Sequence, residues 1–478
     1  MATFTKDWIS WIDHNVSTGC DKNGIFKILL DEGFTHQQIK KQMNFEPLGN
    51  VATIVNPLRA QQEAQRNANQ NMAVAHSKSD GIFFHNARKL DTNLVDLHVI
   101  DNFLNKEECE KIIKLIEKMK RPSLMCNHEN KDSSFRTSST CDLGQLNDPF
   151  IDEIDKRICK MIGIDASYSE PLQGQFYEEG QEFKAHTDYF EADEKAHMAN
   201  GRGQRTFTFF INLNDVEEGG TTYFPNLDFT HQPVMGTAII WNNLLPDGQG
   251  NHNALHQGCP IIKGTKAIIT KWFRTGGRGP MMTKTPNEKV PNYTEIGFTK
   301  SRLPDDLFKK ITDFYHTNHA NHVEEFVDGD FIKGKKLNGK KSKRAPSSLL
   351  DLPPALKQEV HDHMKPVLEE WADTELEPTF VYGIRTYHDT AKLKTHRDRL
   401  NTHIISCIIN IHQDVREDWP LQIEDNYYRK HSVIMKPGEM VFYESARLDH
   451  GREIALKGKA FANIFCHFKP VGYIPPAT

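Results

Sequence analysis

The feature that most constrains this 478-residue chain is a series of short, strand-like segments separated by turn-forming residues. Between residues 83 and about 280, a stretch with helical periodicity at 106–119 is followed by the segments 205–214, 236–241 and 266–273, which are rich in apolar and β-branched residues. Asn, Asp, Gly and Pro gather between these segments, where turns are expected. Short strands of this kind predict a mainly β barrel or jelly roll with helical support.

The same order returns in the C-terminal half. Residues 303–371 again have helical periodicity, which is interrupted by a basic, glycine-containing loop near 329–346. Strand-like segments then resume from Val381 to Pro470, for example at 402–411 and 439–443. Helix followed by β structure therefore occurs twice along the chain.

The first 50 residues differ from both halves. Large apolar residues recur there at helical spacing, Asp21 and Thr35 are expected N-caps, and Gly33 is an expected helix stop. This pattern predicts a small three-helix bundle with its own core, and a role in docking a partner stays open. Residues 51–82 are rich in Gln, Asn, Ala and Ser and are interpreted as a linker or a solvated helix.

Composition and charge argue against several classes of function. Hydrophobic residues make up 38% and charged residues 26%, which is ordinary for a globular protein. The net charge of -5 is small for this length, so no global field favours nucleic acid or an anionic membrane. The basic run from Lys333 to Arg344 is interpreted as a solvated loop. No stretch approaches the ~18 apolar residues of a membrane span.

The N-terminus and the cysteines bear on the compartment. The chain begins Met1-Ala-Thr-Phe-Thr-Lys-Asp-Trp, without the apolar core of a signal peptide. Its eight cysteines are scattered with no CxxC pair, as expected for reduced thiols. We therefore expect a cytoplasmic protein; the sequence does not indicate its oligomeric state.

Histidines followed by an acidic residue are the candidate metal ligands of the chain. An acidic residue follows two positions after each of four histidines that we considered: His186, His322, His396 and His412. With 23 histidines in the chain, several such triplets are expected by chance. His322 lies in a stretch predicted to be helical, where residues i and i+2 do not face each other, and His412 follows a predicted buried strand. Both are set aside.

Two imidazoles and one carboxylate on one face suit an Fe(II) ion that must keep open positions for oxygen. Residues i and i+2 of a strand point the same way, so His186-Thr-Asp188 at a strand end can supply two such ligands. A third ligand must then come from elsewhere in the barrel.

The surroundings of His186 distinguish it from the other triplets. They form a series of blocks in order: Arg136-Thr-Ser-Ser, Tyr177-Glu-Glu-Gly-Gln-Glu-Phe-Lys-Ala-His-Thr-Asp-Tyr-Phe, Gln204-Arg-Thr-Phe-Thr, Leu213-Asn-Asp-Val-Glu-Glu-Gly-Gly-Thr-Thr-Tyr-Phe-Pro and Leu255-His-Gln-Gly-Cys-Pro-Ile-Ile-Lys-Gly-Thr-Lys. Over roughly residues 90–275 these blocks closely resemble the prolyl 4-hydroxylase family of 2-oxoglutarate oxygenases. The resemblance implies a double-stranded β-helix, which is a jelly roll.

The resemblance also implies roles for individual residues. His186, Asp188 and His256 become the ligands of Fe(II). Lys266, ten residues past His256, becomes the anchor of the distal carboxylate of 2-oxoglutarate, which suits a fixed ammonium in a partly dry pocket. Tyr177 is expected either to hydrogen-bond the cosubstrate or to pack in the core.

Three further expectations follow from the resemblance. The carboxylate of Asp188 favours hydroxylation, because related halogenating enzymes lack it. The segment 191–203 is either a substrate-gating lid or an ordinary loop, and Arg274 is expected to be structural. Peptidyl proline is the usual substrate class of the family, although other substrates occur on the same scaffold.

The C-terminal half repeats the spacing of these residues. Tyr387 precedes His396 by nine residues, the spacing found between the tyrosine and the first histidine of the central domain, and Asp398 completes the triplet. His450 takes the place of the distal histidine, so the candidate second triad is His396, Asp398 and His450. Ten residues after His450 stands Ala460 instead of lysine.

Other cations could replace the missing lysine. Lys459 would point to the opposite face in the same strand register, although a bulge could re-aim it. Lys457 or Arg452 could also substitute. Three interpretations stay open: a second active oxygenase, a metal-binding but inactive domain, and a degenerate substrate-binding or structural domain.

We therefore predict an α+β chain with two double-stranded β-helix domains, supporting helices and an N-terminal helical module. The expected boundaries are 1–50 for the module, 51–82 for the linker, 83–290 for the oxygenase domain and 296–478 for the second β-helix domain.

The predicted function is that of an Fe(II)- and 2-oxoglutarate-dependent dioxygenase. It would hydroxylate an unactivated C–H, above all in a prolyl residue of a peptide or protein, using O2 and releasing succinate and CO2, with ascorbate as a supporting reductant. Two alternatives stay open: a binding or scaffold protein with pseudo-oxygenase domains, and an oxygenase of small molecules. The weakly acidic charge gives no support for nucleic acid.

Overall fold

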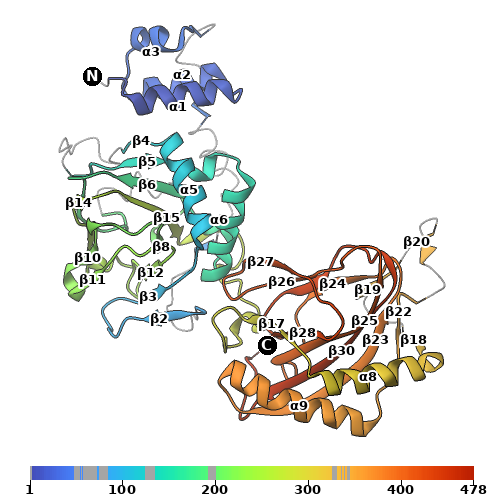
Figure 1. Cartoon of the computed structure of the whole chain (residues 1–478). Helices are drawn as coiled ribbons and strands as arrows, with labels where there is room; N and C mark the ends of the chain where they lie inside the picture. Colours follow the sequence, from blue (N-terminus) through green and yellow to red (C-terminus); the bar gives the residue numbers. More distant parts are fainter. Residues whose placement is uncertain are drawn as a thin grey trace. The chain divides into compact units, whose positions relative to one another are not determined.

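The chain forms two compact units, Met1–Thr283 and Lys284–Thr478 (Figure 1). The division falls before residue 290, where the sequence predicts the central domain to end. The computed structural model describes residues 3–47, 54, 56–57, 73–74, 84–123, 135–191, 201–325, 331–334, 336–337, 340–341 and 345–477.

Three short helices form the N-terminal module: α1 (Lys6–Ser17), α2 (Lys22–Asp31) and α3 (His36–Met43). Asp21 caps α2 by accepting from the N–H groups of its first turn, and Thr35 forms a reciprocal capping box with Gln38 at the start of α3. Both predicted caps are confirmed. Gly33 follows α2 with a φ of +85°, which ends the helix as expected. The apolar faces meet in a core of Trp8, Ile12, Ile25, Phe26, Leu29, Phe34 and Ile39.

A large antiparallel sheet dominates the rest of the first unit. Its strands are, in spatial order, β2 (Ala87–Lys89), β3 (Leu97–Ile100), β12 (Ala238–Asn242), β8 (Arg205–Asn212), β15 (Lys266–Arg274), β6 (Gln173–Tyr177), β5 (Ser139–Cys141) and β4 (Arg121–Pro122). The helices α5 (Lys106–Met119) and α6 (Pro149–Ile162) support it (Figure 1). α5 has the predicted bounds. It packs closely on β6, where a Cβ at Gly174 would lie 2.7 Å from the side chain of Ile116.

A smaller sheet completes the jelly roll of the first unit. Its spatial order is β11 (Phe229–His231), β10 (Thr222–Phe224), β13 (His256–Gly258) and β7 (Phe183–His186). Phe224 of the small sheet packs in one buried cluster with Trp241 and Tyr177 of the large sheet. The core therefore lies between the two sheets, as in a β-sandwich.

The second unit also contains a large and a small sheet. The large sheet has the order β17 (Phe298–Arg302), β28 (Glu439–Tyr443), β25 (Ile405–Val415), β30 (Gly458–Pro470), β23 (Leu376–Tyr387), β22 (Ser347–Leu349) and β18 (Val323–Glu325). The small sheet has the order β19 (Ile332–Lys333), β24 (Lys392–His396), β29 (His450–Arg452), β26 (Leu421–Glu424) and β27 (Lys430–Val433).

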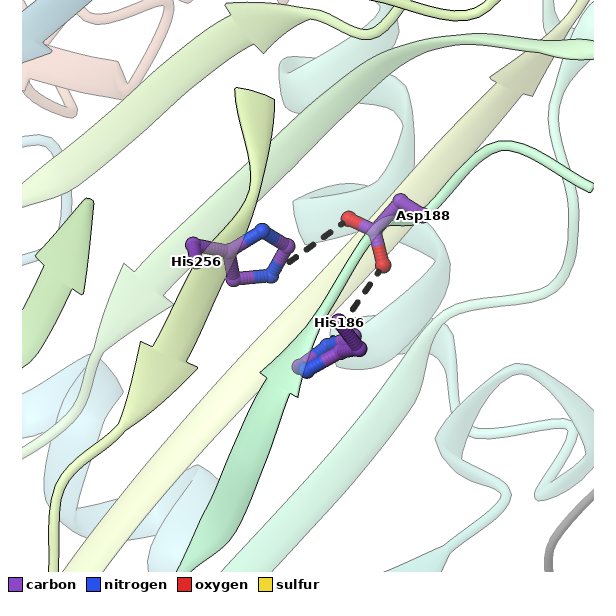
Figure 2. A group of neighbouring side chains, drawn as sticks. All are labelled: His186, Asp188 and His256. Atoms are coloured by element: carbon purple, nitrogen blue, oxygen red, sulfur yellow. Dashed lines mark ion pairs between the residues drawn. The ribbon is translucent and has the colours of Figure 1, made fainter. Parts of the chain in front are cut away.

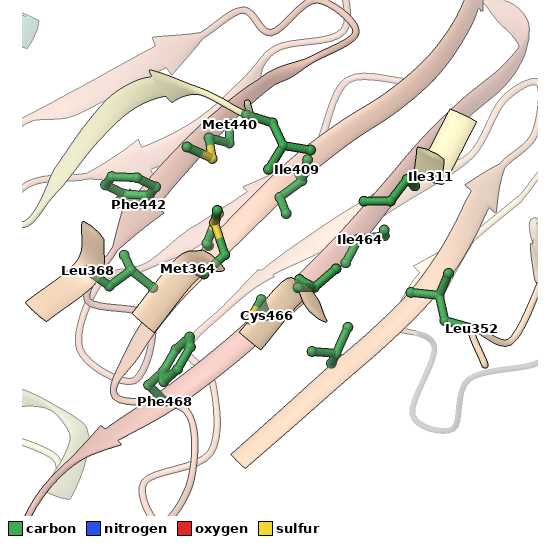
Figure 3. Close-up of a cluster of buried hydrophobic side chains, with 14 of the residues drawn as sticks. Ile311, Leu352, Met364, Leu368, Ile409, Met440, Phe442, Ile464, Cys466 and Phe468 are labelled. Carbon is green, nitrogen blue, oxygen red and sulfur yellow. The ribbon is translucent and has the colours of Figure 1, made fainter. Parts of the chain in front are cut away.

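Two helices cover the outer face of this large sheet. α8 (Asp305–Thr317) contributes Ile311, and α9 (Pro354–Ala372) contributes Met364 and Leu368 to a buried cluster with Ile464 of β30 and Phe442 of β28 (Figure 3). A second cluster joins the two sheets on the other face, where Leu421 and Ile423 of β26 meet Val441 and Tyr443 of β28. The large sheet is therefore buried on both faces.

The two units share one strand order. In the large sheets, β12-β8-β15-β6 corresponds to β28-β25-β30-β23, and in the small sheets β11-β10-β13-β7 corresponds to β27-β26-β29-β24. The turns before β12 and β28 match as well: Gly236 and Gly438 both have a positive φ and donate their N–H to the carbonyls of Asn212 and Asn410. Asn410 is thus the counterpart of Asn212, which aligns the two units residue by residue.

Two histidines lie elsewhere than the sequence suggests. The structure ends α8 at Thr317 and places His322 directly before β18, so the helical expectation for His322 is wrong. His412 lies within β25 instead of following it. In the part of the chain that the structure describes, neither belongs to a group of three side chains that could hold a metal ion.

Some predictions concern residues outside those described. Nearly all of the linker at 51–82, residues 192–200 of the segment proposed as a lid, and parts of the basic loop near 329–346 belong to this group. Within the described ranges, no helix is both long enough and apolar enough to cross a membrane. The cysteines in these ranges are all free thiols.

Candidate active site

Two antiparallel strands of the small sheet bring the predicted ligands together. His186 at the end of β7 is the direct register partner of His256 at the start of β13, and the ring centroids lie 4.3 Å apart. Asp188 follows His186 by two residues, and its carboxylate lies between the two imidazoles (Figure 2). The three side chains that the sequence predicts as a set therefore converge.

The imidazoles are oriented by their own strands. The Nδ1–H of His186 donates to the carbonyl of Lys184 at 2.8 Å, and the Nδ1–H of His256 donates to the carbonyl of Ala254 at 3.0 Å. These bonds fix the tautomer and leave both Nε2 lone pairs free. The Nε2 atoms lie 4.0 Å and 3.9 Å from the two carboxylate oxygens of Asp188. All three ligand atoms lie within 4.8 Å of one another.

A buried chain of hydrogen bonds holds the carboxylate of Asp188. Thr208 on β8 donates its hydroxyl to Oδ2 of Asp188 at 2.7 Å, and the side-chain amide of Asn243 donates to Thr208 at 2.9 Å. The indole N–H of Trp241 donates to the amide oxygen of Asn243 at 2.8 Å. This chain of hydrogen bonds holds Oδ2 of the carboxylate in place.

Burial and charge set the protonation states that a metal site needs. Burial first, and the neighbouring His256 second, lower the pKa of His186 to about 3, so its imidazole is neutral. Burial alone would raise the pKa of Asp188, but His256, His186 and Arg205 outweigh it and keep the pKa below its usual value. Neutral imidazoles and an ionised carboxylate are the forms that bind a cation.

Lys266 is a buried cation without an acidic partner. Its side chain is 3% exposed, and burial lowers its pKa to about 7. The ammonium donates to the carbonyl of Gly220 at 2.6 Å and to the hydroxyl of Thr222 at 3.2 Å. Among the described residues it forms no ion pair with a carboxylate, so the charge is available to an anion that enters the barrel.

Two other predicted residues take distinct positions. Tyr177 is the register partner of Lys266, and its hydroxyl donates to Gln175 at 2.7 Å. It lines the same cavity as Lys266 and is also part of the core, so both expectations for it agree with its position. Arg274 forms an ion pair with Glu170 at 2.7 Å, and Arg205 binds the same carboxylate.

One cavity of about 640 Å³ joins these groups. Its wall includes His186, Asp188 and His256 together with Lys266 and Tyr177. A ligand that chelates a metal at one end and carries a carboxylate at the other would meet a matching group at both ends. The residues present therefore fit an Fe(II) ion with two imidazoles and one carboxylate, and they fit 2-oxoglutarate through the ammonium of Lys266.

Comparison with known proteins identifies the family. Residues 172–274 match the model of the 2OG-Fe(II) oxygenase superfamily. The chain is 39% identical over 200 residues to the probable prolyl 4-hydroxylase 3 of Arabidopsis thaliana, which covers 37% of this chain and 69% of that protein. The chain belongs to the prolyl 4-hydroxylase family. The predicted resemblance is confirmed.

Two further prolyl hydroxylases are similar to parts of this chain. The prolyl 4-hydroxylase subunit alpha-1 of Gallus gallus is 34% identical over 145 residues, which covers 30% of this chain and 28% of that protein. The structure of the viral collagen prolyl hydroxylase from Paramecium Bursaria Chlorella virus-1 is 28% identical with a TM-score of 0.31, covering 37% of this chain and 95% of that chain.

Sequence analysis missed the supports of the prolyl 4-hydroxylase-like site. Thr208, Asn243 and Trp241 hold Asp188, yet none was singled out. The available signal was a hydroxyl residue within β8, a strand whose residues are all buried after Arg205, because a buried polar group requires a partner.

The second predicted triad also converges. His396 and His450 are register partners in β24 and β29, with ring centroids 4.3 Å apart. Their Nε2 atoms lie 3.5 Å and 3.9 Å from the oxygens of Asp398. Each Nδ1–H donates to the carbonyl two residues earlier, at Lys394 and Leu448. This hydrogen-bonding pattern is the one found in the first triad.

The register of the sheets corrects the expected counterpart of Lys266. Lys266 pairs with Tyr177 across β15 and β6, whereas Tyr387 pairs with Phe461 across β30 and β23. The counterpart is therefore Phe461 and not Ala460.

The three cations considered as substitutes differ sharply in burial. Lys459 is 85% exposed and pairs with Asp414, and the exposed Lys457 pairs with Glu417. Arg452 is only 2% exposed. Of the three, only Arg452 lies inside the unit.

Proposed function

We propose that the chain hydroxylates a prolyl residue of a peptide or protein in the cavity of its first unit. Fe(II) would bind to His186, Asp188 and His256, and the distal carboxylate of 2-oxoglutarate would pair with Lys266. The observation that carries the proposal is that three converging ligand atoms and a buried, unpaired ammonium share one cavity of about 640 Å³. The family supports the same reaction.

The side chains of the site perform distinct tasks. When bound, Fe(II) and 2-oxoglutarate would allow O2 to act as the oxidant, with one oxygen atom converting an unactivated C–H to C–OH and the other ending in the succinate that is released with CO2. His186 and His256 present their Nε2 atoms, and Thr208 holds the carboxylate of Asp188. Lys266 would orient the cosubstrate by its distal carboxylate.

The cavity wall also suits a prolyl substrate. Phe135, Phe190 and Trp272 line the cavity together with the ligand residues. Aromatic walls bind proline-rich segments in several unrelated proteins, because the ring of proline packs flat on an aromatic face. The wall also contains Glu170, whose pKa burial alone would raise but which Arg205 and Arg274 hold at about 2. The carboxylate of Glu170 in this wall is therefore ionised and paired with two arginines.

We interpret the second unit as a second double-stranded β-helix. Its two sheets repeat the strand order of the first unit, and its candidate triad repeats the position of the ligands at the ends of β24 and β29. Duplication of one β-helix within the chain accounts for both features.

The test is hydroxylation of a synthetic proline-rich peptide by the full-length chain with Fe(II), 2-oxoglutarate and ascorbate. Succinate formation and a peptide mass gain of one oxygen atom are measured for wild type, His186→Ala and His36→Ala. His36 lies in the N-terminal module with an exposed side chain, so its variant is the matched control. We expect peptide-dependent succinate formation in wild type and in His36→Ala and none in His186→Ala.

Two further readouts separate the parts of the proposal. Tandem mass spectrometry of the product locates the new oxygen, and an oxygen on a residue other than proline would contradict the substrate assignment. Iron content is measured on the same preparations. Wild-type protein that binds no iron at His186 would contradict the oxygenase mechanism itself.

A further inference from the structure

The interior of the second unit contains a buried cation of its own. Arg452 is the last residue of β29, two positions after His450, so both side chains point to the same face of the strand. In the first unit the equivalent position is Gly258, which lines the cavity that contains Lys266. Arg452 therefore projects into the space that corresponds to the cosubstrate cavity of the first unit.

The guanidinium of Arg452 lies beside the residue that occupies the register position of Lys266. Its Cζ is 4.5 Å from the ring centroid of Phe461, which occupies the register position of that lysine, and 4.7 Å from the ring of Trp419. The cation has moved from β30 of the large sheet to β29 of the small sheet, but it reaches the same part of the barrel. Packing between two aromatic rings fixes the plane of the guanidinium.

Buried hydrogen-bonding groups around Arg452 are left without partners. One nitrogen of the guanidinium, Nη1, donates to the carbonyl of Trp419. Within the described part of the chain, Nη2 of Arg452 and the hydroxyl of Tyr387 have no hydrogen-bond partner, and both residues are buried. Buried polar groups are almost always paired, so two orphans beside one uncompensated cation indicate a missing anion.

Another arginine of the unit provides a contrast. Arg385, two residues before Tyr387, is held by Glu325 through two hydrogen bonds of 2.7 Å each. Its charge is therefore neutralised within the protein. Arg452 forms no ion pair with a carboxylate among the described residues, so it alone of the two is free to bind an anion.

We propose that the second unit is a second metal and 2-oxo acid site, in which His396, Asp398 and His450 bind a divalent metal and Arg452 binds the distal carboxylate of the 2-oxo acid. Tyr387 donates its hydroxyl to the same carboxylate. The ligand class is a five-carbon dicarboxylic 2-oxo acid, of which 2-oxoglutarate is the probe, because it chelates a metal at one end and presents a carboxylate at the other. The correspondence rests on the 2-oxoglutarate site proposed for the first unit, whereas binding at the second unit is tested separately below.

The experiment uses the full-length chain with the first site disabled by His186→Ala and Lys266→Ala. Mn(II) replaces Fe(II), and binding of 2-oxoglutarate is measured by isothermal titration calorimetry. We expect one 2-oxoglutarate per chain, bound only when Mn(II) is present. Absence of metal-dependent binding would overturn the proposal, whatever the outcome for peptide hydroxylation by the unaltered chain.

Arg452→Met tests the anchor, and pyruvate provides the internal control. Pyruvate has the metal-chelating end of 2-oxoglutarate and lacks the distal carboxylate. Loss of a charge-assisted hydrogen bond from Nη2 and of the charge itself should weaken 2-oxoglutarate binding at least about thirtyfold and leave pyruvate binding unchanged. Equal losses for both ligands would show that Arg452 is only structural. Arg416→Met removes an exposed arginine of the same unit and should change neither affinity.

A second variant tests the same assignment if Arg452→Met does not fold. The double variant Arg452→Gly and Phe461→Lys gives the second unit the residues of the first at both positions, Gly258 and Lys266. We expect this folded variant to bind 2-oxoglutarate again with Mn(II). Failure to bind in a protein with an unchanged melting temperature would contradict the assignment of this space to the distal carboxylate.

Discussion

The two units hold the same three metal-ligating side chains in the same hydrogen-bonding arrangement and surround them with different walls. In both, a pair of cross-strand histidines donates from Nδ1 to its own strand and turns Nε2 toward an aspartate. Behind the triad, the first unit places Lys266 on β15 and the second places Arg452 on β29. The proposed metal ligands are therefore the same in the two units, while the proposed anion-binding residue differs.

The supports of the aspartate have diverged as well. Thr208 holds Asp188 at 2.7 Å in the first unit. Its counterpart Ser406 instead bonds to His467, and the aspartate Asp398 receives a longer bond of 3.4 Å from Tyr443. In each unit the two histidines lie on one pair of adjacent strands. The residues that surround them lie on other strands, and these residues differ between the units.

The largest expected effect is the loss of metal binding at one of the two sites. His186→Ala and His396→Ala should each weaken Mn(II) binding at their own site at least about 1000-fold, more than the loss of an outer hydrogen-bond partner costs. Equilibrium dialysis should find about two ions per wild-type chain and about one in each variant. A wild-type chain that binds a single ion would show that one triad is not a metal site.

The next effect concerns the anion end of the first site. In a chain whose second site is disabled by His396→Ala, Lys266→Met should weaken 2-oxoglutarate binding about 100-fold, because a buried ion pair with the distal carboxylate is lost. Lys263→Met, which removes an exposed lysine paired with Glu217, is the matched control. Unchanged affinity in Lys266→Met by calorimetry would assign the carboxylate to another group.

A smaller effect tests the supports of the aspartates. Thr208→Val removes the 2.7 Å bond to Asp188 and should weaken Mn(II) binding at the first site about 30-fold. Tyr443→Phe removes the 3.4 Å bond to Asp398 and should cost the second site less. Dialysis of the two variants against Mn(II) measures both costs, and the reverse order would contradict the role assigned to Thr208.

The smallest effect is a difference in pH dependence. Burial lowers the pKa of Lys266 to about 7, and an anion bound to its ammonium raises that pKa again. Below pH 7 the ammonium is already charged, whereas above pH 7 binding must take up a proton. Affinity of the first site for 2-oxoglutarate should therefore fall by up to about tenfold between pH 7 and pH 8.

The second site should not share this pH dependence, because arginine stays charged over the whole range. Calorimetry from pH 6.5 to pH 8.5 on the two single-site chains measures both profiles. Parallel profiles would show that the ionisation of Lys266 does not control binding at the first site.

Local patterns allowed much of this arrangement to be predicted from the sequence. Asp21 and Thr35 cap helices because their side chains act on their own first turns, and α5 begins and ends at the predicted residues. The triads converge because the H-x-D spacing places two ligands at one strand end. The distal histidine was placed by resemblance, since no local rule fixes which strand supplies it.

Cross-strand register could not be predicted in the same way. Counting ten residues from His450 leads to Ala460, but the pairing of β30 with β23 places Phe461 opposite Tyr387. A shift of one residue exchanges the two faces of a strand, so a count along the chain is not sufficient. The hydrogen bond from Thr208 to Asp188 was missed for the same reason, because it joins β8 to residues 20 positions earlier.

The hydrogen bond from each ligand histidine to the carbonyl two residues upstream has a wider consequence. The carbonyl that orients the first histidine, the histidine itself and the aspartate all lie within one stretch of five residues, at 184–188 and again at 394–398. A segment of this kind can be duplicated without the strands that surrounded it and still orient the Nε2 atom of its histidine toward a metal. Changes elsewhere in the fold can then alter which ligand each copy binds without disturbing the proposed metal-ligating residues. One chain can therefore hold two sites with the same ligand residues and different ligand specificity.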